Sequence, residues 1–263
     1  MLIDFHTHAF PDSIAQNAIP KLSQIAGGLQ PHTDGTVSDL KRSMDEGGVD
    51  ISVVLNIATN AHQQKSVNDF AAAINADPRI VAFGSVYPHV DDAMDELDRI
   101  RELGLIGVKL HPDYQHFSVD DEKMKPLYRK ISELGLLVLF HAGLDYGYPP
   151  PYGATPEKLA RALNWLDTPV IAAHWGGLQC CEGVIQHLCG RDIYFDTAFS
   201  YGTMPKYFAQ TILEKHGADR ILFGTDTPWH TPNMEMKLLN SLRLTDSELS
   251  MITHENAEKL LKL

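Results

Sequence analysis

Two histidines separated by a single residue lie near the start of the chain, in the segment DFHTH (residues 4–8). Alternate side chains of an extended strand point to the same face, so His6 and His8 would lie side by side. Neutral imidazoles are common ligands of zinc and of other first-row divalent metals. The spacing therefore predicts half of a metal site at the end of the first strand.

Further histidines, two acids and a lysine lie at the carboxyl ends of several later apolar segments. Imidazoles combined with one or two carboxylates, without thiolates, are typical of a site for Zn²⁺ or a related divalent ion. A catalytic site of this kind keeps one position for water, whose pKa the metal lowers towards about 7. The expected chemistry is attack of hydroxide on a polarised carbonyl, or metal anchoring of a substrate carboxylate or hydroxyl. The residues at these segment ends are Lys109, His111, His141, His174, Asp196 and Asp226.

Eight short apolar segments carry these residues, and helix-like stretches separate them. Nearly continuous apolar runs are typical of strands that are buried on both faces of a parallel sheet. Eight such strands over about 250 residues predict a (β/α)8 barrel, an α/β fold, in a single domain spanning residues 1–263. A doubly wound sheet often has a Gly-rich first turn, and none follows the first segment here. The segments are 2–8, 50–57, 80–88, 107–112, 137–143, 170–176, 193–199 and 221–228.

Two connections are longer than a barrel requires, residues 9–35 and residues 144–154. Both follow a predicted strand end, on the face where barrel enzymes have their active sites. We therefore expect these two loops to cover the pocket. Helix boundaries are marked by four residues: Gly104 and Gly135 after two helices, and Thr155 and Thr245 before two others.

The composition indicates an ordinary globular protein, with 44% hydrophobic and 21% charged residues. The formal net charge of −12 argues against a nucleic acid or an anionic membrane as partner. No apolar stretch approaches the roughly 18 residues that cross a bilayer. Three cysteines do not suggest a disulfide framework. We expect a cytoplasmic protein that acts on a small molecule, and a homo-oligomer is compatible with the sequence.

The order of these motifs resembles the amidohydrolase superfamily. More narrowly, it is similar to the amidohydrolase-related branch that includes 2-amino-3-carboxymuconate-6-semialdehyde decarboxylase. The resemblance extends over nearly the whole chain. The matching stretches are DFHTH, GVKLHP, LFHAG, AAHWGG, YFDTA, ILFGTDTP and, in the last helix, NAEKLL.

The resemblance implies a metal site and an acid/base residue. His6 and His8 would bind one divalent ion together with His141 and Asp226. The ion would most readily be Zn²⁺, with Mn²⁺, Co²⁺ or Fe²⁺ as alternatives. His174 would act as acid/base beside the metal, sharing the handling of protons with Asp226.

The fourth segment departs from the pattern of binuclear relatives, which often carry a carboxylated lysine at this strand end. Here His111 takes the outermost position and Lys109 lies two residues deeper, so a single metal is favoured. Lys109 is then expected to bind a substrate anion or to pair with Asp196, which could also orient a metal ligand. His111 is expected to face the substrate. Three further residues directly follow predicted catalytic positions and would line the pocket mouth: Trp175, Trp229 and His230.

Three functions remain open at this point. The leading interpretation is a metal-dependent hydrolase that acts on a small amide, lactone or ester through a metal-activated water. The second is a metal-dependent, non-oxidative decarboxylase of an unsaturated or aromatic acid, in which Lys109, His111 and His230 would receive the carboxylate. A strand-end arginine would favour that second function, and none is present. The third is a non-catalytic metal-binding barrel, although every expected ligand position is filled. The other histidines are expected at the surface: His32, His62, His187, His216 and His254.

Overall fold

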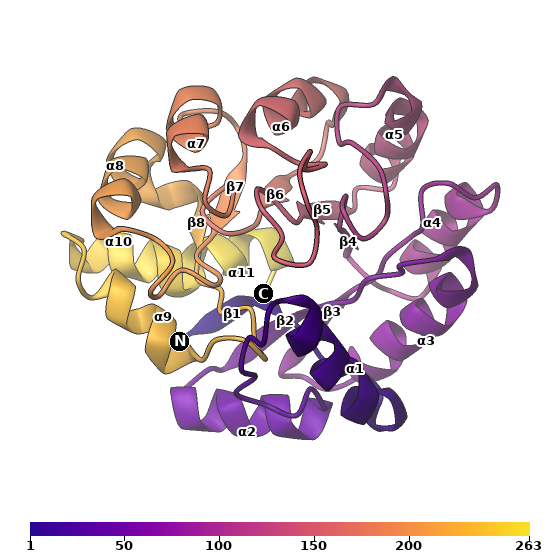
Figure 1. Cartoon of the computed structure of the whole chain (residues 1–263), viewed down its shortest axis with the longest axis horizontal. Helices are drawn as coiled ribbons and strands as arrows, with labels where there is room; N and C mark the ends of the chain where they lie inside the picture. The colour runs from indigo at the N-terminus through magenta and orange to yellow at the C-terminus, as the bar shows by residue number, and fades with distance from the viewer.

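The computed structural model of the chain describes residues 1–263 and contains eight strands that alternate with helices (Figure 1). Neighbouring strands pair in parallel, β1 to β3 in one sheet and β4 to β8 in another. The strands are β1 (Ile3–Thr7), β2 (Ile51–Leu55), β3 (Ile80–Phe83), β4 (Gly107–Leu110), β5 (Leu137–Phe140), β6 (Val170–Ala172), β7 (Tyr194–Asp196) and β8 (Ile221–Leu222).

Isolated bridges join the two sheets into a closed barrel. Gly84, directly after β3, bridges Val108 of β4 in parallel. At the other seam, Thr7 of β1 bridges Thr227, which lies beyond β8. The N–H of His8 also donates to the carbonyl oxygen of Thr227, at 2.7 Å. The eight-stranded barrel that the sequence predicts is therefore confirmed.

The strands are shorter than predicted because the chain leaves extended geometry where the candidate residues begin. The segment 170–176 was expected to be one strand, yet β6 ends at Ala172. His174 and Trp175 then have φ values of +59° and +56°, in the left-handed region that L-residues seldom occupy. Asp226, beyond β8, has a φ of +68°. Such conformations concentrate at functional sites.

Helices form the outer layer of the barrel (Figure 1). Thr155 and Thr245 cap two of them as predicted, and Thr245 forms a reciprocal capping box with Glu248. Gly104 and Gly135 follow two helices with φ values of +77° and +63°. None of the helices combines the length and hydropathy needed to cross a bilayer. The helices are α1 (Asp12–Ile25), α2 (Val37–Gly47), α3 (Gln64–Ile74), α4 (Ala93–Glu102), α5 (Lys125–Glu133), α6 (Pro156–Ala162), α7 (Cys181–His187), α8 (Lys206–His216), α9 (Pro232–Leu239), α10 (Asp246–Ser250) and α11 (Asn256–Leu261).

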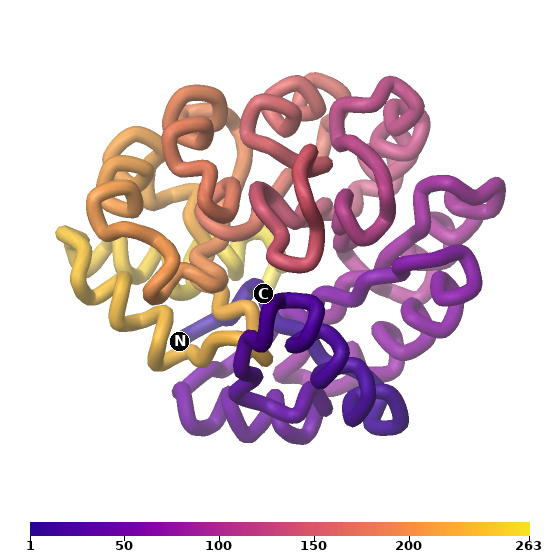
Figure 2. Tube along the Cα trace, viewed as in Figure 1, coloured from indigo at the N-terminus to yellow at the C-terminus, as the bar shows by residue number.

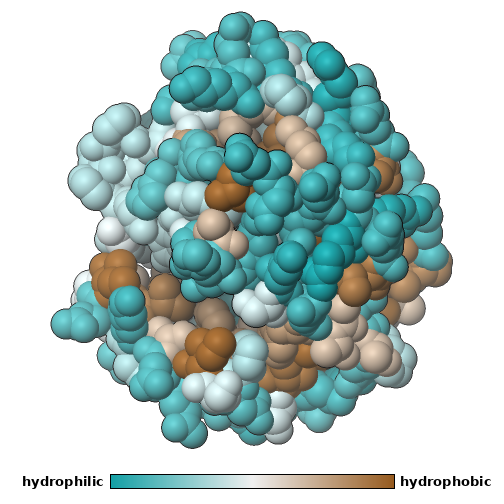
Figure 3. Space-filling view, turned by 90° about the vertical axis from the view of Figure 1, so that its right-hand side faces the viewer, coloured by the Kyte–Doolittle hydropathy of each residue, from teal (hydrophilic) through white to brown (hydrophobic).

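Two apolar layers hold the barrel, and the alternation along β5 shows how they divide. Val138 and Phe140 point outward into the core between strands and helices. Leu137 and Leu139 point inward, into a smaller cluster that also receives Leu260 of α11. Ile3 of β1 belongs to the same cluster, so segments near both ends of the chain pack there. Figure 2 follows the backbone between the two marked termini. The surface over α3 to α5 is largely hydrophilic with separate hydrophobic patches (Figure 3), as expected for helices that bury one face.

Candidate active site

Three of the predicted residues converge at the carboxyl ends of the first and last strands. The Nε2 atom of His6 lies 3.3 Å from Oδ1 of Asp226, and Nε2 of His8 lies 3.2 Å from the same oxygen. The three side chains could hold a metal ion, since their ligand atoms lie within 4.8 Å of one another. These residues come from opposite ends of the chain and meet only because the barrel closes between β1 and β8.

The outer nitrogens of both imidazoles are anchored, and this determines where their lone pairs point. Nδ1 of His6 donates to Oδ2 of Asp196 at 2.7 Å, and Nδ1 of His8 donates to the carbonyl oxygen of Leu55 at 2.8 Å. A neutral imidazole with hydrogen on Nδ1 has its lone pair on Nε2. Burial keeps His6 neutral, because it lowers the pKa of this imidazole well below its usual value.

The Asp226 carboxylate therefore faces two imidazole lone pairs. Burial by itself would raise the pKa of Asp226, but the neighbouring His8, His6 and His174 hold it well below its usual range, so this group is a carboxylate. A carboxylate and two lone pairs at 3.2–3.3 Å repel one another unless a cation lies between them. The donor set and its orientation thus fit a divalent metal ion.

A second pair of imidazoles lies beside this group. Nε2 of His141 donates to the carbonyl oxygen of Leu144 at 3.1 Å, and Nδ1 of His174 donates to that of Ala198 at 3.0 Å. Their remaining nitrogens, Nδ1 of His141 and Nε2 of His174, face each other at 3.2 Å. In the neutral rings both would carry lone pairs, so a proton or a cation is again required between them.

His141 is next to the first group without joining it. The ring of His174 lies between them, with its centroid 5.1 Å from that of His6 and 4.9 Å from that of His141. The acid nearest to His141 is Asp145, whose Oδ2 lies 4.0 Å from Nε2. The structure therefore arranges the four predicted ligands as a trio with a neighbouring fourth imidazole.

Asp196, at the end of β7, connects the two groups. It is fully buried, and its Oδ1 accepts the N–H groups of His174 (2.8 Å) and Ala198 (3.1 Å) while Oδ2 holds His6. Burial raises the pKa of this carboxyl. One carboxylate thus holds the imidazole of His6 directly and the backbone of His174, and its role in orienting a metal ligand stays a prediction.

Lys109 is fully buried on β4, in register with the inward-pointing Leu139. Its Nζ atom has no hydrogen-bond partner, and the expected ion pair with Asp196 is not formed. Burial lowers the pKa of this amine to about 8, although the charges of Asp196 and Asp226 act in the opposite direction. A buried amine without a partner is costly for the fold, so it points to a ligand that supplies one.

His111 differs from its predicted orientation towards the substrate. Its ring is stacked between Tyr114 and His141, with centroid distances of 3.9 Å and 4.1 Å. Nε2 lies 3.3 Å from Asp145, and Nδ1 accepts the N–H of Tyr114 at 3.4 Å. Both ring faces and both nitrogens are therefore occupied, and the side chain supports His141 from behind.

The three residues expected at the pocket mouth have different environments. Trp175 is fully buried in the outer core, because the two successive left-handed residues direct it away from the mouth. Trp229 is half-buried and follows Asp226 in a turn that its N–H closes on the Asp226 carbonyl. His230 is buried, and its Nδ1 lies 2.5 Å from Oε1 of Glu235.

Sequence reasoning missed three acids and misplaced one histidine. Asp4 precedes His6 on β1, and burial raises its pKa to about 8; its spacing from His6 was an available signal. Asp145 and Glu235 contact His111 and His230 from a loop and a helix, where no sequence pattern marks them. His216, expected at the surface, is buried in a stack on Phe195.

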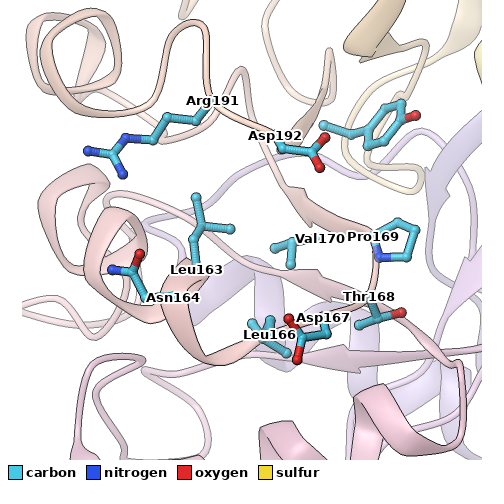
Figure 4. A pocket seen from close by; sticks show the side chains of 10 residues that line it. Leu163, Asn164, Leu166, Asp167, Thr168, Pro169, Val170, Arg191 and Asp192 are labelled. Carbon is cyan, nitrogen blue, oxygen red and sulfur yellow. The ribbon is translucent and has the colours of Figure 1, made fainter.

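The two loops predicted to cover the pocket contact each other. The loop of residues 9–35 contains α1, whose last residue is Ile25. Ile25 packs closely on Gly147 of the loop 144–154, and a Cβ atom at Gly147 would lie 2.5 Å from its side chain. A hollow of about 760 Å³ lies elsewhere, at the amino ends of β6 and β7 (Figure 4). It is lined by Val170, Arg191 and Tyr194 among others, at the opposite end of the strands from the histidines.

Comparisons with known proteins cover nearly the whole chain. A family model described as amidohydrolase matches residues 3–263. Decarboxylase orsB of Emericella nidulans is 24% identical in an alignment that covers 94% of this chain and 91% of that protein.

Solved structures share the barrel. The uncharacterised TIM-barrel protein Bb4693 of Bordetella bronchiseptica superposes with a TM-score of 0.80 at 21% identity, covering 99% of this chain and 98% of that one. A dihydroxybenzoic acid decarboxylase of Polaromonas sp. JS666, with bound manganese and the inhibitor 2-nitroresorcinol, has a TM-score of 0.73 at 17% identity. That match covers 100% of this chain and 97% of the other.

Proposed function

Because the chain belongs to the amidohydrolase family, we propose that it is a metal-dependent, non-oxidative decarboxylase of an aromatic or unsaturated carboxylic acid. The observation that carries this proposal is the similarity to decarboxylase orsB over almost the full length of both chains. The sequence alone favoured hydrolysis of an amide, lactone or ester, with decarboxylation as the alternative. The relatives support the alternative, and hydrolysis becomes the second candidate.

The proposed metal ligands are His6, His8 and Asp226, with His141 as the neighbouring fourth. Their lone pairs and charge suit Zn²⁺, and the manganese of the Polaromonas relative makes Mn²⁺ the first alternative. A bound divalent ion would act as a Lewis acid and hold a carboxylate or hydroxyl oxygen of the substrate.

The remaining residues would bind the acid and handle one proton. The Lys109 ammonium would pair with a negatively charged oxygen of the substrate, which gives its Nζ the partner that the fold does not. When the bond to the carboxyl carbon breaks, its electron pair stays on the substrate carbon and CO₂ leaves. That carbon then takes one proton, for which the proposed donor is the imidazolium form of His174. Its Nδ1 is held by Ala198, and its Nε2, which is directed inward, would carry the transferred proton and take up the next one from solvent.

Carbon dioxide release without incorporation of water oxygen distinguishes the two candidate reactions. With metal-loaded protein and a panel of hydroxybenzoates in H₂¹⁸O, we expect stoichiometric CO₂ and an aromatic product that contains no ¹⁸O. Mass spectrometry of the product and headspace analysis of CO₂ measure this. Cleavage of esters or lactones with ¹⁸O in the new carboxylate, and no CO₂ from any acid, would establish the hydrolase instead.

Replacing Asp196 tests whether the carboxylate behind His6 supports metal binding. Partners of this kind typically contribute 10–100-fold to metal affinity, so we expect Asp196→Asn to weaken metal binding by about that factor. Competition with a chromophoric chelator measures the affinity. Asp113→Asn is the matched control, since Asp113 is a buried acid that accepts from Gly153 and contacts no imidazole. Equal affinities of the two variants would contradict the role given to Asp196.

A further inference from the structure

His230 and Glu235 form a hydrogen-bonded pair beyond the last strand. Both side chains are buried, and Nδ1 of His230 lies 2.5 Å from Oε1 of Glu235. An ionised carboxylate only accepts hydrogen bonds, so the hydrogen is on Nδ1 of the imidazole. In the neutral ring the lone pair is then on Nε2, the same tautomer that a carboxylate selects in hydrolytic triads.

Several donors hold the Glu235 carboxylate in this orientation. It lies in the first turn of α9 and accepts the N–H groups of Ser200 and Tyr201, at 3.1–3.2 Å. The hydroxyl of Ser200 donates to its Oε2. A fully buried carboxylate with this many donors is satisfied as an anion. The pair is therefore rigid, and it connects the loop after β7 to the loop after β8.

The free edge of His230 belongs to the same end of the barrel as the metal ligands. His230 lies four residues beyond Asp226, and its ring stacks on Phe199 with a centroid distance of 4.3 Å. Phe199 directly follows Ala198, whose carbonyl oxygen anchors His174. Nε2 of His230 makes no hydrogen bond within the chain. The backbone N–H of His32 donates to the carbonyl oxygen of Pro228, two residues before His230, at 2.7 Å.

We propose that His230, oriented by Glu235, accepts a hydrogen bond from a second hydroxyl or an amino group of the substrate and so selects for acids that carry one. Phe199 would support the imidazole from behind, and Glu235 would be a positioning residue. A site that offers a fixed acceptor discriminates against an analogue without the donor, because the acceptor is then left unpaired. The inference rests on the proposed function in one respect only, namely that the substrate is an organic acid.

Binding of matched probes to the metal-loaded protein tests this inference without turnover. The probes are salicylate and three dihydroxybenzoates (2,3-, 2,4- and 2,6-), which differ from salicylate by one added hydroxyl. We expect the wild type to bind at least one dihydroxybenzoate about tenfold more tightly than salicylate in calorimetric titrations. In His230→Asn that gain should disappear, since the shorter amide can still donate to Glu235 but presents no atom in place of Nε2.

Two further variants separate this role from a purely structural one. Glu235→Gln loses the carboxylate that selects the tautomer, so the gain should fall by about threefold. The control is Ser241→Ala, which removes a hydroxyl that donates to the carbonyl oxygen of Leu238 in α9 and does not contact Glu235, so its gain should match that of the wild type. Metal content and melting temperature of each variant show that it is folded.

The binding experiment tests the role of His230 separately from the proposed decarboxylase activity. The inference is overturned when the wild type prefers no dihydroxybenzoate to salicylate, or when the preference survives in His230→Asn. Release of CO₂ is measured on the same preparations. A preference that depends on His230 in a protein that releases no CO₂ would contradict the decarboxylase while supporting the acceptor role of His230.

Discussion

Replacing both His6 and His8 by alanine is expected to abolish metal retention and to lower CO₂ release by at least about 10³-fold. The two imidazoles supply two of the three ligand atoms of the group His6, His8 and Asp226. The carboxylate that remains, with His141 beside it, would not hold a divalent ion in competition with water. Metal analysis after dialysis should show about one equivalent per chain in the wild type and almost none in the variant.

The matched control for this variant replaces two histidines outside the ring, His187 and His254, which are only half-buried. That protein should retain its metal and its CO₂ release. Circular dichroism of the metal-free proteins shows whether both variants are folded. Stoichiometric metal in the His6→Ala/His8→Ala protein, or full activity without metal, would contradict the proposed site.

Replacing Lys109 by methionine should have opposite effects on activity and stability. Loss of the ammonium removes a charged hydrogen bond to the substrate anion, worth about 1.5–3 kcal/mol, so we expect kcat/KM to fall by about 100-fold. Methionine fills a similar volume without a buried polar atom, so the free energy of unfolding at pH 7 should rise by about 1–3 kcal/mol. Steady-state kinetics and denaturant unfolding measure the two quantities.

The pH dependence of stability gives an independent check on Lys109. Its pKa is about 8 in the folded protein, against an ordinary value of 10.5. Between these values the unfolded chain binds one more proton than the folded chain, so stability increases with pH by up to about 1.4 kcal/mol per unit. This contribution should be present in the metal-free wild type and absent in Lys109→Met. If the free energy of unfolding of the two proteins depended on pH in the same way, the lowered pKa of Lys109 would be contradicted.

The barrel and much of its functional ring could be predicted from the sequence. Local patterns carry that information: buried apolar runs mark strands, and the parallel barrel brings their carboxyl ends to one face. The resemblance of the motifs to the amidohydrolase superfamily is confirmed by the family match. The convergence of His6 and His8 on Asp226 therefore followed from strand order alone, without knowledge of any side-chain conformation.

The orientation of individual side chains could not be predicted in this way. Trp175 follows His174 directly, and a strand pattern would place it near the mouth; two left-handed residues send it into the core instead. His111 has the expected position but is enclosed by Tyr114 and His141. Backbone dihedral angles and ring stacking depend on how the side chains pack in three dimensions. The spacing of apolar residues in the sequence does not predict this packing.

The groups that hydrogen-bond to the imidazoles could not be predicted from the sequence either. Two of the anchoring acceptors are the backbone carbonyl groups of Leu144 and Ala198, which every residue possesses. The contact of Glu235 with His230 could not be predicted for a different reason. An acid in the first turn of a helix is ordinarily explained by its favourable interaction with the helix dipole. Only the contact with His230 reveals its second role.

The seam between β1 and β8 has a consequence for the newly made chain. The Thr225 hydroxyl pairs with Asp4 across 221 residues of sequence, and Asp226 completes the trio that His6 and His8 begin. Contacts of such long range form late in folding. During synthesis, the amino-terminal imidazoles leave the ribosome long before their carboxylate partner exists, so metal capture at the proposed site would have to follow closure of the barrel.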